Sequence, residues 1–475
     1  MLLERIYDED LAQASYVIGC QATGEAVVVD PRRDVDHYLR LAEAKGLRIA
    51  HVTETHIHAD YLSGTRELAA RTAATIHVSD EGGPDWTYGA GFEGARRLRH
   101  GDSIRVGNVR LTASHTPGHT PEHLSFLVTD GAQASDPGFL LSGDFVFVGD
   151  LGRPDLLDEA AGGTDTRFEG ARQLFASLRD RFLTLPDYVQ VLPGHGAGSA
   201  CGRALGAIAA TTVGYERAFA WWAPYLAADD EAGFVEALLD GQPDAHAYFA
   251  RMKRENREGP ALLGAPSDLP ELSPARVRTL LRDEAAILVD TRHHDAVHEG
   301  TVEGALAIPG AAKAASYGAW VYDPETEDLP LVLLADDREE AQRMRDHLVR
   351  VGIDRVDGYV RTLGGLDLVR PELLAPEQLD PAAITEDASA VLVDVRGRGE
   401  HDAGHIPGSV HLSGGRALWH LDRLPADRTI VTYCQSGVRN SVVASALRRA
   451  GRRVVELDGS YAGWQRSQAS LTSSR

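Results

Sequence analysis

Four short motifs that combine histidine or aspartate with glycine or proline constrain the fold of this chain more than any other feature. They are THIHADY at 55–61, TPGHT at 116–120, LSGD at 141–144 and PGHG at 193–196. Each lies at the end of an apolar run that predicts a β-strand, or in the loop after it. Because strand ends at one edge of a sheet can converge, the motifs predict one metal site built from imidazole and carboxylate groups.

The chain around these motifs predicts mixed α and β layers. Strands are expected at 26–30, 48–53, 75–78, 109–113, 124–128, 139–142 and 189–192, and helices at 38–45, 64–71 and 170–179. Strict alternation of strands and helices is absent, which favours either an α+β fold or an αββα layered sandwich. Residues 211–257 are rich in aromatic side chains and are expected to add a helical cap.

The last 200 residues contain an internal repeat. VDTR ends at Arg292 and VDVR ends at Arg396, and two glycines follow each at the same spacing. Each copy continues into an apolar strand and then a helix, with the strands expected at 331–334 and 430–433 and the helices at 339–350 and 441–450. The repeat therefore predicts two α/β domains with parallel sheets.

Domain boundaries are predicted from proline. Residues 258–274 hold four prolines and two glycines and predict a linker, and a second boundary is expected near 371–381. The resulting domains are 1–262, 263–374 and 375–475.

A cysteine opens the loop CQSGVR, between the predicted strand at 430–433 and the helix after it. Such a turn directs backbone N–H groups at one point, and the helix N-terminus adds positive charge. These features favour a thiolate and bind an anion, so Cys434 is predicted to be a nucleophile and Arg439 its charged partner. The predicted binding loop consists of Gln435, Ser436, Gly437 and Val438.

Charge and cysteine content exclude several classes of protein. The net charge of −22 argues against nucleic acid as a partner. Three cysteines, Cys20, Cys201 and Cys434, do not form a disulfide framework and indicate a reducing cytoplasm. We find no signal peptide and no apolar run of about 18 residues, so no membrane span is expected.

The four motifs, in their order, resemble those of the metallo-β-lactamase superfamily, in particular its glyoxalase II and persulfide dioxygenase branch. The resemblance covers about the first 260 residues. In that superfamily a two-metal hydrolase has a histidine directly after the aspartate of the first motif, whereas this chain has Tyr61. A phenol is a poor ligand for a zinc pair, which argues against the two-metal hydrolases.

The resemblance to persulfide dioxygenases implies one Fe(II) per chain, held by His56, His119 and Asp144. Two histidines and one carboxylate with open positions are typical of non-haem iron oxygenases. Further groups are expected to orient these ligands or to hydrogen-bond bound water. These groups are His58, Asp60 and His195. Where members of this branch often have Asp-Tyr after the last histidine, this chain has Gly and Ala, so the identity of the carrier thiol stays open.

Two residues near the expected iron each have two possible roles. Arg153 matches an arginine of the family and is either a substrate-binding cation or a structural partner of Asp150 or Asp155. Cys201 is either a sulfur relay or a packed small residue, while Cys20 is expected in the core.

The CQSGVR loop, with VDVR and its glycines, resembles the rhodanese family and implies sulfur transfer at Cys434. In the preceding copy the equivalent place is Ala335, followed by two aspartates. That domain is therefore predicted to be a rhodanese-like domain without catalysis, acting as a spacer or docking module.

Three functions are compatible with these features. The leading hypothesis is a cytoplasmic, bifunctional enzyme that oxidises a small thiol persulfide with O₂ to thiol and sulfite, and transfers sulfane sulfur between sulfite and thiosulfate. The second is a zinc thioesterase of the glyoxalase II type with a sulfurtransferase domain, and the third a non-catalytic sensor or scaffold. Oligomeric state stays open, with a homo-oligomer as one option.

Overall fold

The computed structural model describes residues 1–159, 166–203, 205–265, 268–386 and 389–473. The chain divides into two compact units, Met1–Ala245 with Phe249–Ala265, and His246–Tyr248 with Pro266–Arg475. Residues 266 and 267 of the predicted linker lie outside the described residues. The two predicted internal boundaries, after 262 and after 374, stay predictions.

Two six-stranded sheets form the centre of the first unit. The first sheet has the order β1-β2-β3-β4-β5-β6 and the second the order β12-β11-β10-β9-β8-β7. The strands of the first sheet are β1 (Leu2–Asp8), β2 (Gln13–Cys20), β3 (Glu25–Val29), β4 (Arg48–Thr53), β5 (Thr75–Ser79) and β6 (Arg96–Leu98). Those of the second are β7 (Ser103–Val106), β8 (Val109–His115), β9 (Leu124–Asp130), β10 (Phe139–Gly143), β11 (Gln190–Pro193) and β12 (Thr211–Thr212).

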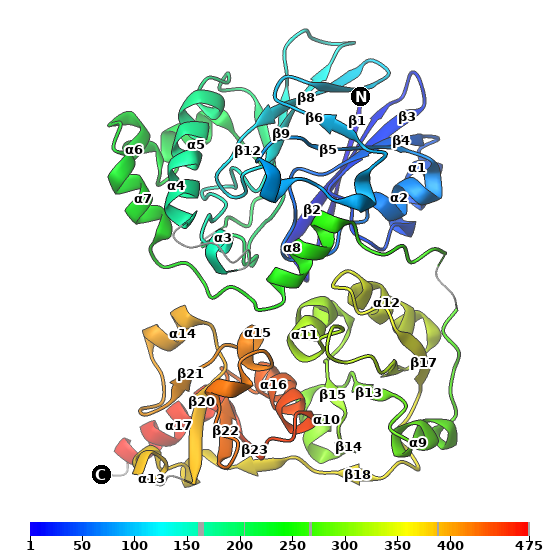
Figure 1. The fold of residues 1–475 in the computed structure, drawn as a ribbon. Helices are drawn as coiled ribbons and strands as arrows, with labels where there is room; N and C mark the ends of the chain where they lie inside the picture. Colours follow the sequence, from blue (N-terminus) through cyan, green and yellow to red (C-terminus); the bar gives the residue numbers. More distant parts are fainter. Residues whose placement is uncertain (160–165, 204, 266–267, 387–388, 474–475) are drawn as a thin grey trace. The chain divides into compact units, whose positions relative to one another are not determined.

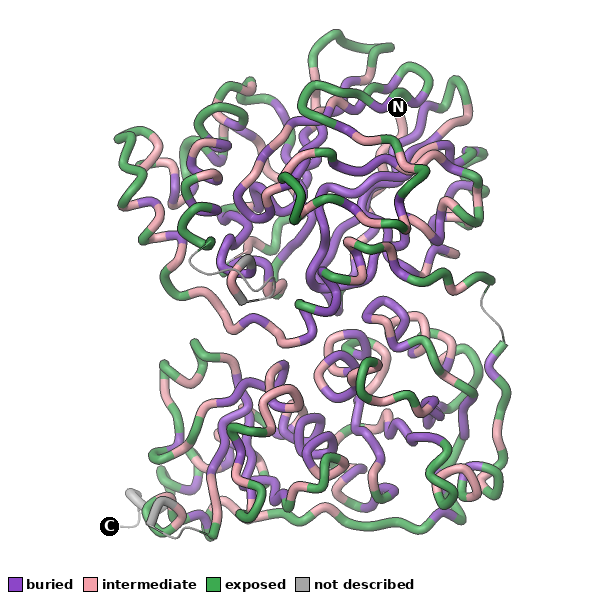
Figure 2. Tube along the Cα trace, viewed as in Figure 1, coloured by how far each residue is buried: buried purple, intermediate pink, exposed green. Residues whose placement is uncertain are grey.

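The apolar core of this unit lies between the two sheets. Side chains of β2 and β3 pack against those of β8, β9 and β10, among them Tyr16, Val27 and Phe126. Along β8 buried side chains alternate with more exposed ones, as expected for a strand with one face in a core. The strands between the helical layers are accordingly mostly buried (Figure 2).

Helices cover the outer faces of both sheets (Figure 1). Tyr38 and Leu68 anchor two helices on the first sheet, and Phe175 and Phe234 anchor two on the second. The helices of this unit are α1 (Asp36–Ala44), α2 (Thr65–Thr72), α3 (Leu156–Glu159), α4 (Thr166–Ser177), α5 (Val213–Phe219), α6 (Ala223–Ala227), α7 (Glu231–Leu239) and α8 (Phe249–Glu258). Short turns of other helix types lie at Pro84–Trp86, Ala90–Phe92 and Leu178–Phe182.

The predicted αββα sandwich is confirmed, and all seven predicted strands coincide with strands. The prediction omitted β1, β2, β6, β7 and β12. β2 is buried along its whole length, but Gln13, Ser15 and Gly19 interrupt the apolar run that would identify it, and β12 has only two residues.

Strand direction explains why the motifs converge. β10 pairs in parallel with β11 and antiparallel with β9, which in turn pairs antiparallel with β8. β8, β10 and β11 therefore end at the same edge of the second sheet, and three of the motifs follow these ends. The THIHADY motif follows β4 of the facing sheet.

The second unit contains two parallel sheets with the same strand order. The order β15-β13-β16-β17 recurs as β21-β20-β22-β23, to which β19 is added. The strands are β13 (Ile287–Asp290), β15 (Leu306–Ala307), β16 (Leu331–Leu334), β17 (Val356–Val360), β19 (Glu372–Leu374), β20 (Ala390–Asp394), β21 (Val410–His411), β22 (Thr429–Tyr433) and β23 (Val454–Leu457). β14 (Thr301–Val302) and β18 (Leu368–Val369) form a separate pair.

Helices complete this unit. They are α9 (Pro274–Arg282), α10 (His294–Glu299), α11 (Ala314–Val321), α12 (Arg338–Val349), α13 (Pro381–Glu386), α14 (Arg398–Ala403), α15 (Gly414–Ala417), α16 (Val438–Arg449) and α17 (Ser460–Ser473). The 3₁₀ turns lie at Ala311–Lys313, Pro376–Gln378 and Leu421–Arg423. The predicted parallel α/β architecture of this region is confirmed.

Within the described part of the chain, no helix combines the length and apolarity needed to cross a membrane.

Packing between the sheets predicts a stability effect. Phe126 is fully buried in that core, so Phe126→Ala should lower the free energy of unfolding of its unit by about 3–5 kcal/mol, because the transfer free energy of the ring is lost and a cavity remains. Urea denaturation followed by circular dichroism measures this change. Phe219→Ala is the matched control: its ring is 72% exposed, and the expected change is within about 0.5 kcal/mol. Equal effects of the two substitutions would contradict this account of the core.

Candidate metal centre and cysteine loop

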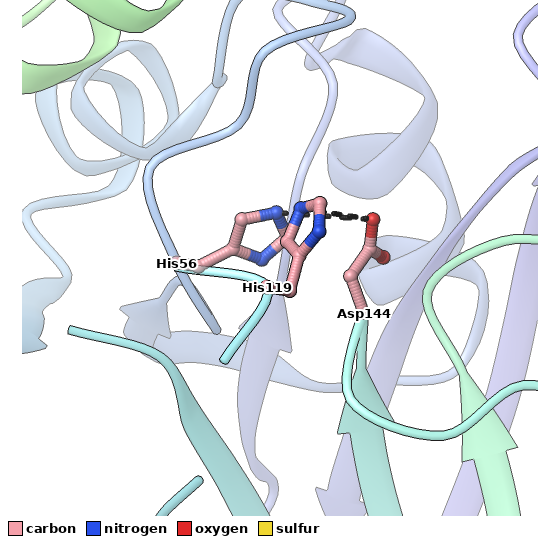
Figure 3. Close-up of side chains that lie close together, drawn as sticks. All are labelled: His56, His119 and Asp144. Carbon is pink, nitrogen blue, oxygen red and sulfur yellow. Dashed lines mark ion pairs between the residues drawn. The ribbon is translucent and has the colours of Figure 1, made fainter. Parts of the chain in front are cut away.

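His56, His119 and Asp144 converge from three strand ends. Their nearest ligand atoms all lie within 4.8 Å of one another, and all three side chains are buried. Nε2 of His119 lies 3.6 Å from Oδ2 of Asp144, and Nε2 of His56 lies 3.9 Å from the same oxygen. Figure 3 shows both imidazole rings directed at this carboxylate oxygen.

Hydrogen bonds at Nδ1 leave Nε2 of each histidine directed at the site. Nδ1 of His119 donates to the carbonyl oxygen of Arg153 at 2.8 Å, and Nδ1 of His56 lies 2.9 Å from the hydroxyl of Thr55. Burial lowers the pKa of His119 to about 4 and lowers that of His56 well below its usual range. Both rings are therefore neutral near pH 7, which is the form that binds a metal.

Asp144 is held by His195, which lies between two carboxylates. Nδ1 of His195 lies 2.8 Å from Oδ1 of Asp144, and Nε2 lies 2.9 Å from Oδ2 of Asp60. Burial alone would lower the pKa of His195, but the two carboxylates raise it well above its usual range. Burial alone would raise the pKa of Asp144, and His195 instead holds it low. The pair is thus an imidazolium bound to a carboxylate.

The free oxygen of Asp144 fits a bound metal. Within the described part of the chain, Oδ2 of this fully buried carboxylate has no hydrogen-bond partner. Leaving such an oxygen unsatisfied costs free energy, and a cation would remove this cost. Ligand atoms about 2 Å from a metal lie roughly 3–4 Å apart, which matches the two distances to this oxygen. Two neutral imidazoles and one carboxylate suit a divalent transition metal.

Asp30, which the sequence analysis did not single out, supports the THIHADY loop. Its Oδ1 accepts the N–H of Thr55 at 2.7 Å and lies 3.1 Å from Nε2 of His58, and its Oδ2 accepts the Thr55 hydroxyl at 2.9 Å. Burial alone would lower the pKa of His58, but Asp30 raises it. Because Asp30 ends a strand parallel to β4, its position at the edge of the sheet was a usable signal.

Tyr61 is directed at backbone and not at the metal ligands. Its hydroxyl donates to the carbonyl oxygen of Asp30 at 3.2 Å and accepts from Nε2 of Gln13 at 3.2 Å. Burial raises the pKa of this phenol well above its usual range, so it stays protonated. These contacts agree with the expectation that the tyrosine is a poor metal ligand.

Two further buried groups support the site: His123, a histidine expected to be structural, and Glu122, which was missed. His123 positions Asp144, since its Nε2 accepts the N–H of Asp144 at 3.1 Å. Glu122 accepts the N–H of Ile57, between the two histidines of the first motif, at 2.7 Å. Glutamate and histidine in a loop carry no sequence signal for such backbone contacts.

Lys253 of α8 is another buried group that the sequence did not single out. Its ammonium is buried 4.9 Å from the centre of the Trp86 ring, and among the described residues it has no hydrogen-bond partner. Burial lowers the pKa of Lys253, Glu122 acts against this lowering, and the positive charge contributes to the low pKa of His119. The ammonium therefore interacts electrostatically with Glu122 and His119 without a hydrogen bond to either.

Arg153 has a carboxylate partner within the chain. Its Nε donates to Oδ1 of Asp155 at 2.8 Å, its Nη2 pairs with the second oxygen, and its Nη1 donates to the carbonyl oxygen of Ala200 at 3.2 Å. The geometry favours the structural interpretation of this residue, while its own carbonyl orients His119. Its contact with substrate stays a prediction.

Cys201 lies beside the centre. Cys201, Asp60 and His195 form a buried group. Their potential ligand atoms lie within 4.8 Å of one another. Burial, together with Asp60 and Asp144, raises the pKa of the thiol well above its usual range. A protonated thiol is a weak nucleophile, so the relay role stays a prediction without support from this geometry.

Cys434 lies where β22 ends and the loop before α16 begins. Its Sγ accepts the N–H of Gly437 at 3.1 Å and lies 3.8 Å from the hydroxyl of Ser460. Gly437 has φ +118°, a conformation that side chains rarely adopt. The loop thus brings a backbone donor to the sulfur, as the sequence analysis anticipated.

The other residues of this loop do not contact the sulfur in the same way as Gly437. The side-chain oxygen of Gln435 accepts from Nη1 of Arg396 at 3.3 Å, Ser436 is exposed, and Val438 begins α16. Arg439 donates from both Nη atoms to Glu400, at 2.6 and 2.8 Å. Its charge is therefore already balanced by a carboxylate, which the sequence analysis did not anticipate.

Removing one supporting contact should weaken metal binding. Thr55→Val keeps the shape of the side chain but removes the hydroxyl that links His56 to Asp30. Metal affinity is expected to fall by about 10–100-fold, measured by competition with a chromophoric chelator. Thr53→Val is the control, because among the described residues that buried hydroxyl makes only one long contact, of 3.5 Å, to a backbone oxygen. Unchanged affinity in Thr55→Val would contradict the supporting role.

Two protein-family models match this chain. The metallo-beta-lactamase superfamily model matches residues 8–195, and the rhodanese-like domain model matches residues 378–467. This chain resembles the crystal structure of a metallo-beta-lactamase from Staphylococcus aureus subsp. aureus COL, with 39% sequence identity and a TM-score of 0.65. The match covers 76% of this chain and 98% of that one.

Two curated relatives match the first unit at lower coverage. Persulfide dioxygenase ETHE1, mitochondrial, of Mus musculus is 28% identical over 196 residues, which is 41% of this chain and 68% of that protein. Hydroxyacylglutathione hydrolase of Polaromonas sp. (strain JS666 / ATCC BAA-500) is 32% identical over 199 residues, which is 41% of this chain and 66% of that protein. The chain therefore belongs to the metallo-beta-lactamase superfamily and carries a rhodanese-like domain in its C-terminal part.

Proposed function

We propose that the first unit is an Fe(II)-dependent persulfide dioxygenase and that the C-terminal domain is a sulfurtransferase acting through Cys434. The observation that carries the proposal is the buried set of His56, His119 and Asp144, with one free carboxylate oxygen and a tyrosine in place of a second-metal ligand. A set of two histidines and one carboxylate with open positions is typical of oxygenases that use non-haem iron. The similarity to a persulfide dioxygenase supports the same chemistry.

The first reaction converts a thiol persulfide, O₂ and water into the thiol, sulfite and two protons. Ferrous iron supplies the redox chemistry by which O₂ oxidises the outer sulfur. His56, His119 and Asp144 would hold one iron per chain. His195, with Asp60 behind it, fixes the Asp144 carboxylate, and Asp30 fixes His58 and the first ligand loop. These contacts keep the ligands in place without reorganisation.

Substrate charge is met by Lys253. The persulfide is an anion, and the ammonium of this residue is buried, without a hydrogen-bond partner among the described residues, and close enough to His119 to influence its pKa. A desolvated cation binds an anion more strongly than an exposed one does. We therefore assign Lys253 to substrate binding, in addition to the earlier prediction of Arg153.

The second reaction moves one sulfur atom. The Cys434 thiolate attacks the outer sulfur of thiosulfate, sulfite leaves with the electrons of the broken S–S bond, and Cys434 becomes a persulfide. The reverse reaction uses sulfite made by the first unit as the acceptor. Covalent connection of the two sites raises the effective concentration of the shared product. The partners are thus small sulfur compounds and O₂, and we place the reactions in the cytoplasm.

The domain at 263–374 is proposed to be rhodanese-like without its own chemistry. Ala335 follows β16 as Cys434 follows β22. Arg292 pairs with Asp290 and donates to the carbonyl oxygen of Gly300, and Arg396 makes the same contacts with Asp394 and Gly404. Asp337 caps α12 where the other copy binds an anion.

A zinc thioesterase is the alternative function of the first unit. The similarity to hydroxyacylglutathione hydrolase favours it. Tyr61 opposes it, because its hydroxyl bonds the backbone of Asp30 and offers no second-metal ligand.

Metal content and O₂ uptake test the proposal. Anaerobically purified protein should contain about one iron per chain and consume O₂ when glutathione persulfide or coenzyme A persulfide is added. His119→Ala should abolish uptake by removing a ligand, whereas Cys434→Ser should leave uptake intact and abolish sulfur transfer. Two zinc ions per chain with thioester hydrolysis and no O₂ uptake would establish the alternative instead.

The assignment of Lys253 makes a separate prediction. Lys253→Met should raise KM for the persulfide in O₂ uptake by roughly 10–150-fold with a smaller change in kcat, because one charge-assisted contact contributes about 1.5–3 kcal/mol to binding. Lys45→Met is the matched control, since that side chain is 42% exposed and its ammonium pairs with Glu4. An unchanged KM in Lys253→Met would remove this residue from the substrate site.

A further inference from the structure

The helix that follows the Cys434 loop is buried on all sides. Eight consecutive residues of α16 are buried: Asn440, Ser441, Val442, Val443, Ala444, Ser445, Ala446 and Leu447. A helix on a domain surface buries one stripe, so a second structure must cover the opposite face. One face packs on its own sheet, through Val443 and Leu447.

The Cys-less domain covers the other face. α10, α11 and β15 all contact α16. The N–H of Ala307 in β15 donates to the hydroxyl of Ser445 at 3.0 Å. Nε2 of His298 in α10 lies 3.1 Å from Oε2 of the fully buried Glu456, whose other oxygen accepts from Arg448 at 2.6 Å. The two domains therefore share buried polar contacts as well as apolar surface.

His294 carries this contact to the sulfur-binding loop. A Cβ atom placed on Gly437 would lie 2.6 Å from Nε2 of His294 and 2.8 Å from its Cδ2, so the imidazole packs directly on this glycine. The N–H of the same glycine donates to Sγ of Cys434. Gly437 thus contacts the sulfur of Cys434 through its N–H and the neighbouring domain through His294.

We propose that the Cys-less domain completes the Cys434 site and that His294 is a positioning residue, which holds the Gly437 amide against the sulfur. The inference deepens the proposed sulfur transfer and rests on it. Arg439 is already paired with Glu400, so negative charge on the sulfur depends on the loop amides. The N–H of Gly437 reaches the sulfur only while this glycine keeps its unusual conformation. The imidazole of His294 occupies the space into which the glycine would otherwise move.

In the transfer step, the Cys434 thiolate forms a bond to the outer sulfur of thiosulfate as the S–S bond of thiosulfate breaks and sulfite departs with the electron pair. No oxidant or reductant is consumed. The N–H of Gly437 stabilises the thiolate before attack, so its displacement slows the step without removing any group that touches thiosulfate.

The test compares His294→Ala with His293→Ala in the full-length protein. His293 lies in the same turn and, like His294, pairs with Asp295, but its side chain is 59% exposed whereas that of His294 is 14% exposed. Sulfur transfer is measured from thiosulfate to cyanide, and iodoacetamide alkylation of Cys434 is followed against pH by peptide mass spectrometry. His294→Ala should lower kcat/KM about tenfold and move the alkylation midpoint to higher pH, while O₂ uptake is unchanged.

His293→Ala should match the unsubstituted protein in all three measurements. His294→Gln, which refills most of the space over Gly437, should recover most of the transfer and the original midpoint, and it serves as the test if His294→Ala does not fold. Unchanged transfer and midpoint in His294→Ala, or equal losses in both alanine variants, would overturn the inference. If the unsubstituted protein transfers no sulfur, the proposed function fails, whereas the alkylation midpoint still decides the role of His294.

Discussion

The contact between His195 and Asp144 determines the geometry of the metal centre. One oxygen of the Asp144 carboxylate is bound by the imidazolium, so the other is directed at His56 and His119. In a buried site neither charge is tolerated alone, and each side chain depends on the other for its ionisation state. The same histidine continues to Asp60, which extends the constraint from the second sheet to the THIHADY loop of the first. The αββα sandwich makes this contact possible because it brings four strand ends together.

The two candidate sites differ in the groups that would hold an ion. The candidate metal centre offers side chains, and each of these is held by a further hydrogen bond, as His119 is by the carbonyl oxygen of Arg153. At Cys434 the sulfur accepts the backbone N–H of Gly437, whose direction depends on the conformation of the chain and not on any side chain of the loop. A loop of this kind needs a rigid neighbour, and α10 of the Cys-less domain lies against it. On this proposal, a domain without its own nucleophile contributes to catalysis by supporting the loop of its neighbour.

Much of the fold and part of the site were predictable. Seven strands and the parallel repeat could be predicted because alternating or continuous apolar runs reflect burial directly. The convergence of the four motifs followed from their places at strand ends. β2 was missed because Gln13, Ser15 and Gly19 interrupt its apolar run, and Asp30 was missed although its place at a strand end was a usable signal. The sequence could not show that Arg153 pairs with Asp155 or that Arg439 pairs with Glu400, because it reveals possible partners but not the distances between them.

Residue types and their spacing thus determined which atoms are available: two imidazoles and a carboxylate for a metal, a thiol at a strand-to-helix turn, and no thiol in the first copy of the repeat. Only the tertiary structure decided which of these atoms are free to react. It left Oδ2 of Asp144 and the ammonium of Lys253 without hydrogen-bond partners among the described residues, while it placed carboxylates against Arg153 and Arg439. The reason is that availability depends on burial and on the nearest opposite charge, and both are set by residues far apart in the chain. His294 and Gly437, separated by more than a hundred positions in the sequence, meet for the same reason.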